Sequence, residues 1–286
     1  MIPSFIITFR EVLEAALVVG IILSYLVRVK QTKYNNIVYA GIISGIMASI
    51  VGAILFTLLA GGFTGRTEEI FEGITMLVGA LLLTTMILWM MKQKHIAREL
   101  EDKVAAELTK AYKFGIFSVV FVAILREGIE TVIFLRAASL VTTNNTMIGA
   151  ISGIIAAILL GYTMFLGSKK INIKKFFNIT SILLILFAAG LVAHGVHEFQ
   201  EAKVIPTVIE HVWDVNPPLN PDDSYPMLHE KGYVGSTLKG LFGYNGNPSL
   251  IEVLSYLIYI ALVFGLWRNI EKVKRDESFI MEGSLA

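Results

Sequence analysis

The sequence predicts an all-α polytopic membrane protein with seven transmembrane helices, arranged as a 3+3 inverted repeat plus one C-terminal helix. Three features lead to this prediction: the apolar composition, the spacing of long apolar runs, and short motifs that recur in corresponding runs. Hydrophobic residues make up 55% of the 286 residues, and the mean hydropathy is +0.68, which exceeds what a soluble core requires. The net charge of +1 gives no indication of a nucleic-acid partner. Since the chain has no cysteine, carboxylates and histidines must supply any metal ligands.

Apolar runs of about 20 residues, the length that crosses a bilayer, begin close to the N-terminus and continue to the last span. We place them at 3–27, 37–61, 70–91, 114–140, 147–167, 176–199 and 250–268. No basic segment precedes the first run and no small-residue cleavage site follows it, so we expect it to be retained rather than removed as a signal peptide.

Basic residues gather in alternate connections between these runs. They are Arg28, Lys30 and Lys33; Lys92, Lys94, Arg98, Lys103, Lys110 and Lys113; Lys169, Lys170, Lys174 and Lys175; and Arg268, Lys272, Lys274 and Arg275. Because cytoplasmic loops carry the excess of Lys and Arg, the N-terminus is expected outside and the C-terminus inside.

Short motifs repeat in the same order in the two halves of the chain. The pairs are "FREVLE" (9–14) with "LREGIE" (125–130), "ISGI" (43–46) with "ISGI" (151–154), and "FEGIT" (71–75) with "FFNIT" (176–180). When a unit with an odd number of membrane crossings is repeated, the second copy is inverted in the membrane relative to the first. The expected division is a first three-helix repeat (1–91), a cytoplasmic charged helix (92–113), a second, inverted repeat (114–200), an extracytoplasmic loop (201–249), the seventh transmembrane helix (250–268) and a cytoplasmic tail (269–286).

Small residues recur at every fourth position in the second and fifth runs. They are Gly41, Gly45, Ser49 and Ala53, and then Gly149, Gly153, Ala157 and Gly161. Such spacing predicts close helix packing in lipid. Tight packing of these two runs would let the first and fourth runs meet at the repeat interface.

The first and fourth runs each carry three charges on one helical face. The charged residues are Arg10, Glu11 and Glu14, and then Arg126, Glu127 and Glu130. Six such charges would cost on the order of 15 to 20 kcal/mol if they faced lipid, so they must face the protein interior.

Pairing along each helix explains only part of this charge. Pairs at i, i+4 join Arg10 to Glu14 and Arg126 to Glu130, which leaves two glutamates unmatched and two negative charges in excess. Burying that excess requires protons or a cation, and carboxylates suit hard cations such as ferric iron, Mn, Mg or Ca. We therefore predict a central metal site at Glu11, Glu14, Glu127 and Glu130, with Glu14 and Glu130 close enough for one ion to bridge them.

A second group of possible metal ligands stands at the expected outer ends of the third and sixth runs. It contains Glu68, Glu69, Glu72, His194, His197, Glu198 and Glu201. In "HGVHEFQE" the His and Glu side chains share one helical stripe, which would suit an outer entrance for metal ions. Interfacial His and Glu side chains with ordinary hydrogen bonds remain the alternative.

The "REVLE" and "REGIE" motifs resemble the doubled R-E-x-x-E signature of the oxidase-dependent iron permease family, which includes EfeU-type ferric iron permeases of bacteria. "EEIFEG", "AAGLVAHGVHEFQEA" and "LKGLFGYNGNPSLIEVLSY" also look like blocks of that family. The resemblance implies a multi-pass permease of the plasma membrane that imports iron, and it implies ferric iron as the transported form. It implies Glu11, Glu14, Glu127 and Glu130 as transport carboxylates, with Arg10 and Arg126 as their partners.

The resemblance also implies partners: the iron ion as transported substrate, the lipid bilayer, and an extracytoplasmic iron oxidase or iron-binding protein. No organic cofactor is expected, and an oligomer stays open. Three alternatives remain. They are a carboxylate-lined carrier for another divalent cation or for protons, a sensor that binds iron without moving it, and an intramembrane enzyme. The enzyme is disfavoured because His194 and His197 do not form the H-E-x-x-H arrangement of a metalloprotease.

Overall fold

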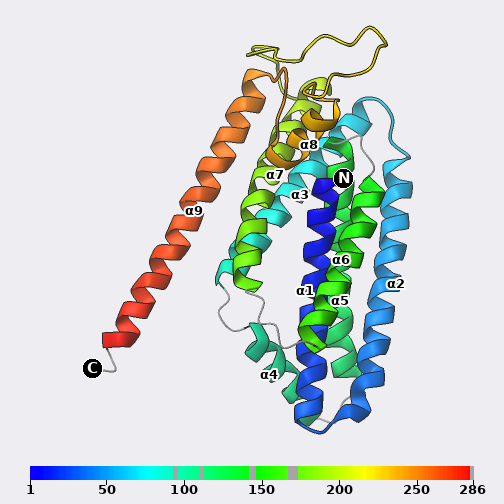
Figure 1. Cartoon of the computed structure of the whole chain (residues 1–286), viewed down its shortest axis with the longest axis vertical. Coiled ribbons are helices and arrows are strands. Elements are labelled where there is room, and N and C mark those ends of the chain that lie inside the picture. The colour runs from blue at the N-terminus through cyan, green and yellow to red at the C-terminus, as the bar shows by residue number, and fades with distance from the viewer. Residues whose placement is uncertain (93–95, 110–112, 142–145, 167–172, 284–286) are drawn as a thin grey trace. The chain divides into compact units, whose positions relative to one another are not determined.

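The computed structural model describes residues 1–92, 96–109, 113–141, 146–166 and 173–283, and all regular structure in these ranges is helical. The elements in Figure 1 are α1 (Ile2–Arg28), the short 3-10 helix η1 (Thr32–Tyr34), α2 (Asn35–Ala60), α3 (Arg66–Lys92), α4 (Ile96–Thr109), α5 (Lys113–Val141), α6 (Thr146–Leu166), α7 (Ile173–Glu201), α8 (Tyr233–Phe242) and α9 (Leu250–Gly283). The all-α prediction is thereby confirmed for the described residues.

Five helical segments are long and apolar enough to cross a membrane. They are Thr32–Ala60, Arg66–Met90, Thr146–Thr163, Asn178–Glu201 and Leu250–Lys272. Helices α1 and α5 are as long, with 27 and 29 residues, but they carry the charged motifs. A polytopic membrane protein is consistent with this pattern, while the seven crossings and their orientation stay predictions.

One helix end differs from the expected one. Helix α9 runs to Gly283, although a cytoplasmic tail was expected from residue 269, because no Gly or Pro interrupts the chain between 269 and 282. The expected extracytoplasmic loop contains one short helix, α8, and the segment expected as a charged helix contains α4.

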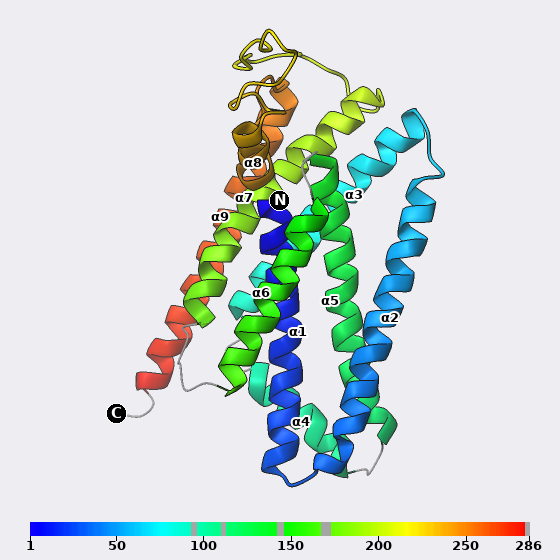
Figure 2. The same cartoon turned by 45° about the vertical axis from the view of Figure 1, so that its right-hand side comes forward.

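The chain forms two compact units. Unit 1 contains residues 1–71 and 95–180, and unit 2 contains residues 72–94 and 181–286. The units do not follow the boundaries of the repeats, because the first two helices of each repeat pack together in unit 1. In that unit α1, α2, α5 and α6 run side by side, as both views show (Figures 1 and 2).

The two ladders of small residues pack against the motif helices. A Cβ added at Gly45 of α2 would lie 2.8 Å from the Ile124 Cβ of α5, and one added at Gly153 of α6 would lie 2.2 Å from the Thr8 Oγ1 of α1. Each ladder therefore packs closely, as the small-residue spacing predicts, and its partner is the motif helix of the other repeat. Small-residue spacing indicates that a helix packs closely but not which helix it meets.

The contacts of the two ladders are equivalent by position. Ile124 and Thr8 each stand two residues before the arginine of their motif. Gly41 lies against Val120 and Gly149 against Ser4, and both of these partners stand six residues before that arginine. Unit 1 thus repeats the same helix contact twice, as an inverted repeat requires.

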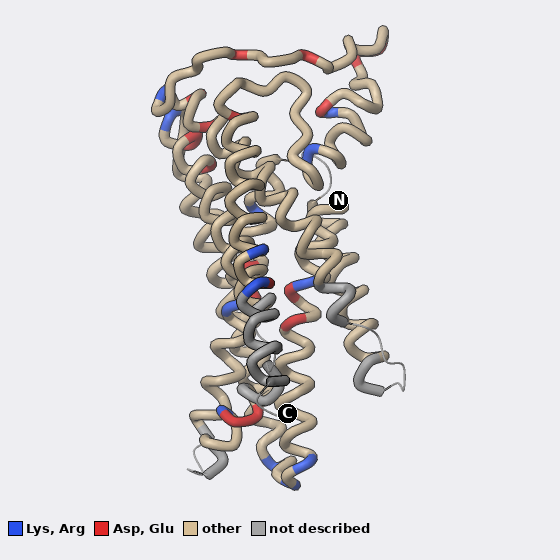
Figure 3. Tube along the Cα trace, turned by 90° about the vertical axis from the view of Figure 1, so that its left-hand side faces the viewer, with Lys and Arg blue, Asp and Glu red and all other residues tan. Residues whose placement is uncertain are grey.

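An apolar cluster closes the end of unit 1 where α1 joins α2. It contains Ile22, Leu26, Tyr34, Val38, Val104, Ile116, Val120 and Ile124. Beside it Arg28 pairs with Glu101 of α4, and Figure 3 shows Lys and Arg gathered at this end of α1 and α2. This is the end that the basic residues predict to be cytoplasmic.

Unit 2 is built on close crossings of α3, α7 and α9. A Cβ at Gly73 of α3 would lie 3.0 Å from the Gly195 carbonyl oxygen of α7, and the reciprocal distance is 3.1 Å. Within the unit, the Thr84 hydroxyl of α3 lies 2.6 Å from the Tyr259 hydroxyl of α9. Helix α8 ends at Phe242 and is capped by Gly243, whose φ of 68° favours glycine.

Candidate metal sites

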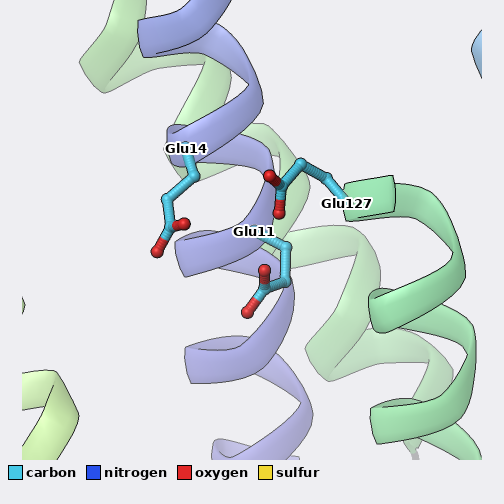
Figure 4. Close-up of side chains that lie close together, drawn as sticks. All are labelled: Glu11, Glu14 and Glu127. Carbon is cyan, nitrogen blue, oxygen red and sulfur yellow. The ribbon is translucent and has the colours of Figure 1, made fainter. Parts of the chain in front are cut away.

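The two motif helices bring carboxylates from both repeats together in unit 1. Glu11 and Glu14 of α1 and Glu127 of α5 each offer a ligand oxygen, and these oxygens all lie within 4.8 Å of one another. Figure 4 shows the α5 side chain reaching toward the two glutamates of α1. Their side chains are 1%, 12% and 5% exposed, respectively. These three residues form the central carboxylate group.

Each motif arginine holds both glutamates of its own helix. Arg10 Nη2 lies 3.0 Å from Glu14 Oε1, and Arg126 Nε lies 3.4 Å from Glu130 Oε1, so the expected i, i+4 pairs are confirmed. The expectation that Glu11 and Glu127 have no arginine partner is wrong. Arg10 Nη1 lies 3.1 Å from Glu11 Oε1, and Arg126 Nη2 lies 2.6 Å from Glu127 Oε1.

Double pairing is possible because a guanidinium presents several N–H donors in a planar fork on a long stem. It does not change the charge balance: four ionised carboxylates share two guanidinium groups. With the glutamates ionised, the site therefore keeps two negative charges in excess inside a largely buried environment.

Several carboxylate oxygens at this site lack a hydrogen bond. Glu11 Oε2, Glu127 Oε2 and Glu130 Oε2 are buried and accept none from the described residues. A buried acceptor without a partner costs about 1 to 3 kcal/mol, and a charged one costs more. Lone pairs that are desolvated but not paired are what a bound cation or a proton would satisfy.

The two motifs contribute unequally. Glu127, rather than Glu130, joins Glu14 in the central carboxylate group, while Glu130 stays with Arg126 one turn further along α5. The arginines also differ, since the Arg10 side chain is completely buried and that of Arg126 is 46% exposed. Glu14 thus approaches Glu127, while the expected approach of Glu14 to Glu130 stays a prediction.

The expected outer group is divided between the two units. Glu68, which is exposed, and Glu69, which is half-buried, lie in the first turn of α3 in unit 1, whereas Glu72 and the α7 residues belong to unit 2. The seven-residue entrance therefore stays a prediction.

Within unit 2, the α7 stripe has a partly exposed end, formed by His197 and Glu201, and a buried part. His197 Nε2 lies 3.2 Å from Glu201 Oε1, and both side chains are about half exposed. His194 is buried, and its Nδ1 lies 2.9 Å from the Gly190 carbonyl oxygen. Glu198 is half-buried on the same helix.

Sequence reasoning missed one carboxylate of this region, Glu252 in the first turn of α9. Its side chain is 2% exposed, and its Oε1 lies 3.0 Å from His197 Nδ1. A local signal was present: "SLIE" at 249–252 has the S-x-x-E pattern of a capping box. The pattern predicts the start of α9 but gives no indication that the glutamate also meets α7.

Comparisons with known proteins agree with the resemblance found in the sequence. The Iron permease FTR1 family matches residues 1–272. The chain is 34% identical over 264 residues to the ferrous iron permease EfeU of Yersinia pestis, which covers 91% of this chain and 90% of that protein. Identity to the ferrous iron permease EfeU of Escherichia coli O6:H1 is 31% over 264 residues, or 91% and 92% of the two chains.

An uncharacterised protein of Archaeoglobus fulgidus is 35% identical over 266 residues, which cover 93% of this chain and 94% of that protein. No solved structure matches the chain significantly. The family match spans nearly the whole sequence, and it includes both charged motifs and the helices that pack on them. The chain belongs to the Iron permease FTR1 family.

Proposed function

We propose that this protein imports iron across the plasma membrane, with the central carboxylate group as the binding site in the transport path and Glu130 as a fourth carboxylate beside it. The observation that carries the proposal is the meeting of Glu11, Glu14 and Glu127 within 4.8 Å, from helices of two different repeats. A site shared by two repeats can be opened to either side when the repeats move against each other.

The donor set favours a metal ion over an organic substrate. The three carboxylates offer only oxygen ligands, which suit hard and borderline cations. Arg10 holds two of the three carboxylates in place, and a bidentate guanidinium restricts their orientation more than a lysine would. We therefore assign the arginines as positioning residues rather than as ligands.

The charge count of the site, with its glutamates ionised, bears on the oxidation state of the iron. Four carboxylates and two guanidinium groups leave two negative charges, which a ferrous ion neutralises and a ferric ion exceeds by one. Charge balance thus favours ferrous iron, in agreement with the names of the Yersinia and Escherichia relatives. Ferric iron, the form implied by the resemblance, is the alternative, together with an extracytoplasmic iron oxidase as its supplier.

The test is uptake of radioactive iron into liposomes that contain the purified protein. Ferrous iron under anaerobic, reducing conditions is compared with ferric citrate, and Mn²⁺, Mg²⁺ and Zn²⁺ are added as competitors. Ferrous uptake that exceeds ferric uptake, and that Mg²⁺ does not inhibit, would support the proposal. Faster ferric uptake would reverse the oxidation-state assignment, and equal competition by Mg²⁺ would favour the general cation carrier.

Substitutions then locate the transport site. Glu11→Gln, Glu14→Gln and Glu127→Gln keep side-chain size but remove the ligand charge, and each should abolish or severely reduce uptake. Glu101→Gln is the matched control, because Glu101 is a glutamate of α4 that pairs with Arg28 at the far end of unit 1. Wild-type uptake in two of the three variants would rule out the central carboxylate group as the transport site.

A further inference from the structure

The strongest feature outside the central carboxylate group is the hydrogen-bond network around Glu252 in unit 2. Glu252 Oε1 accepts the backbone N–H of Ser249 at 3.1 Å, and Oε2 accepts the side-chain N–H of Asn245 at 2.7 Å. The Ser249 hydroxyl in turn accepts the Glu252 backbone N–H at 3.3 Å. Glu252 is thus a buried carboxylate held in one orientation by three groups, the third being His197 of α7.

This carboxylate determines which nitrogen of His197 carries a proton. An ionised carboxylate can only accept hydrogen bonds, so Nδ1, 3.0 Å from Glu252 Oε1, must be the donor. In the neutral ring the lone pair then lies on Nε2. A histidine that donates one N–H to a buried carboxylate while its other nitrogen faces outward has the arrangement found for metal-bound histidines.

The outward nitrogen faces a second acceptor. His197 Nε2 lies 3.2 Å from Glu201 Oε1, and both side chains are about half exposed to solvent. Two lone pairs at this distance repel each other unless a positive charge lies between them or bridges them. Ligands at about 2.1 Å in octahedral geometry are separated by about 3.0 Å along an edge of the polyhedron, so the pair has the spacing of two neighbouring ligands of one metal ion.

We propose that His197 Nε2 and Glu201 form an outer binding site for a divalent transition-metal ion, and that Glu252 is the positioning residue that orients the imidazole toward it. Imidazole nitrogen with carboxylate oxygen suits first-row ions such as Fe²⁺ better than Mg²⁺ or Ca²⁺. Placing this site on the route of the iron rests on the proposed transport function; its binding of a metal does not.

The neighbouring histidine is not part of this site. His194 Nδ1 contacts the Gly190 carbonyl oxygen, and its ring is buried, whereas that of His197 is about half exposed. The alternative for His197 is a doubly protonated ring that bridges Glu252 and Glu201 without any metal. The two readings differ in whether a metal ion acquires a nitrogen ligand.

The experiment measures Mn²⁺ binding to the full-length protein in lipid nanodiscs. A Glu14→Gln/Glu127→Gln background removes the central carboxylate group, so that failure of the outer site is distinguishable from failure of the transport proposal. Binding is followed by electron paramagnetic resonance, and electron spin echo modulation reports whether an imidazole nitrogen is bound. We expect one site with a nitrogen signal, which His197→Ala eliminates and Glu201→Gln weakens at least tenfold in affinity.

Three variants separate positioning from helix capping. Glu252→Gln removes the charge, and Glu252→Asp keeps it but withdraws the carboxylate from His197. Each should lower Mn²⁺ affinity about 10- to 100-fold, as loss of an outer-shell partner typically does. Ser249→Ala removes the hydroxyl that accepts the Glu252 backbone N–H and donates to Gln200 Oε1 of α7, but it keeps the His197 contact with Glu252 and should leave binding close to the parent value. His211→Ala, at an exposed histidine of the 202–249 segment, controls for binding by surface histidines.

Each result decides the assignment. A nitrogen signal that survives His197→Ala, or no Mn²⁺ binding in the parent, would overturn the outer site. Unchanged affinity in whichever Glu252 variant folds would reduce Glu252 to a capping residue. An equal loss in Ser249→Ala would show that the effect passes through the Ser249 hydroxyl, which joins the helix cap to Gln200, and would overturn the positioning role of Glu252.

Discussion

The contact between α2 and α5 offers a sharp test of how the fold positions Glu127. Gly128 follows that glutamate directly, and a Cβ added there would lie 2.0 Å from the Ser49 Oγ and 2.5 Å from the Ser49 Cβ. Rotating the hydroxyl away relieves only the first overlap. Because carbon atoms pack at about 3.5 to 4.0 Å, Gly128→Ala must push α5 from α2 by about 1 Å.

The expected cost can be separated from the change in helix propensity. Alanine favours a helix over glycine by up to about 1 kcal/mol, and Gly52→Ala gains the same benefit at a position with no atom within 4 Å. The difference between the two variants therefore isolates the overlap, which we expect to destabilise Gly128→Ala by about 1 to 3 kcal/mol relative to Gly52→Ala. Uptake should fall as well, because the shift carries Glu127 away from α1.

The assay is heat inactivation in detergent followed by size-exclusion chromatography, with iron uptake measured in parallel. Ser49→Gly/Gly128→Ala is the rescue variant. Without the serine side chain, the nearest remaining atom is the residue-49 Cα at 3.8 Å from the new Cβ, an ordinary van der Waals contact. Equal heat stability of Gly128→Ala and Gly52→Ala would refute the packing argument, and so would a double variant that is no better than Gly128→Ala.

Two further predictions concern the motif arginines and the hydroxyl pair between α3 and α9. Replacing Arg10 by Lys should reduce iron uptake more than replacing Arg126 by Lys. An ammonium cannot hold two carboxylates in a planar fork, and of the two arginines only Arg10 is fully buried. Initial uptake rates in the liposome assay measure the difference, and equal rates for the two variants would contradict the prediction. Tyr259→Phe should lower the free energy of unfolding by about 0.5 to 1.5 kcal/mol, because the hydrogen bond to Thr84 is lost. Iron uptake should stay unchanged, and a loss of uptake would show that this hydroxyl pair serves transport.

Much of the fold could be predicted from the sequence because apolar length and motif order are local properties. The motif pairs placed Arg10 and Arg126 in equivalent positions, and the structure shows equivalent helix contacts around them. The partners of the small-residue ladders could not be predicted, since Gly45 and Gly153 specify a close approach without specifying the approaching helix. That choice depends on the shapes of both surfaces, and these follow only from the assembled unit.

The meeting of glutamates from the two motifs was predicted from the sequence, but its details were not. The free-energy cost of exposing charges to lipid is enough to predict that the glutamates face the interior. Their pairing, in contrast, depends on how far a guanidinium reaches. The selection of Glu127 over Glu130 depends on the rotation of α5 relative to α1, which helical periodicity does not determine. Glu252 was missed because its partner, His197, lies in another helix and 55 positions earlier in the chain.

The central claim is that one iron ion binds between the two motif helices. Anomalous scattering at the iron absorption edge, from crystals of the iron-loaded protein, would locate the ion directly. We expect a peak bonded to carboxylate oxygens of Glu11, Glu14 and Glu127, at the distances of about 2.0 to 2.6 Å that such ligands adopt. Iron found elsewhere in the path, with these three carboxylates bound only to the arginines, would contradict it.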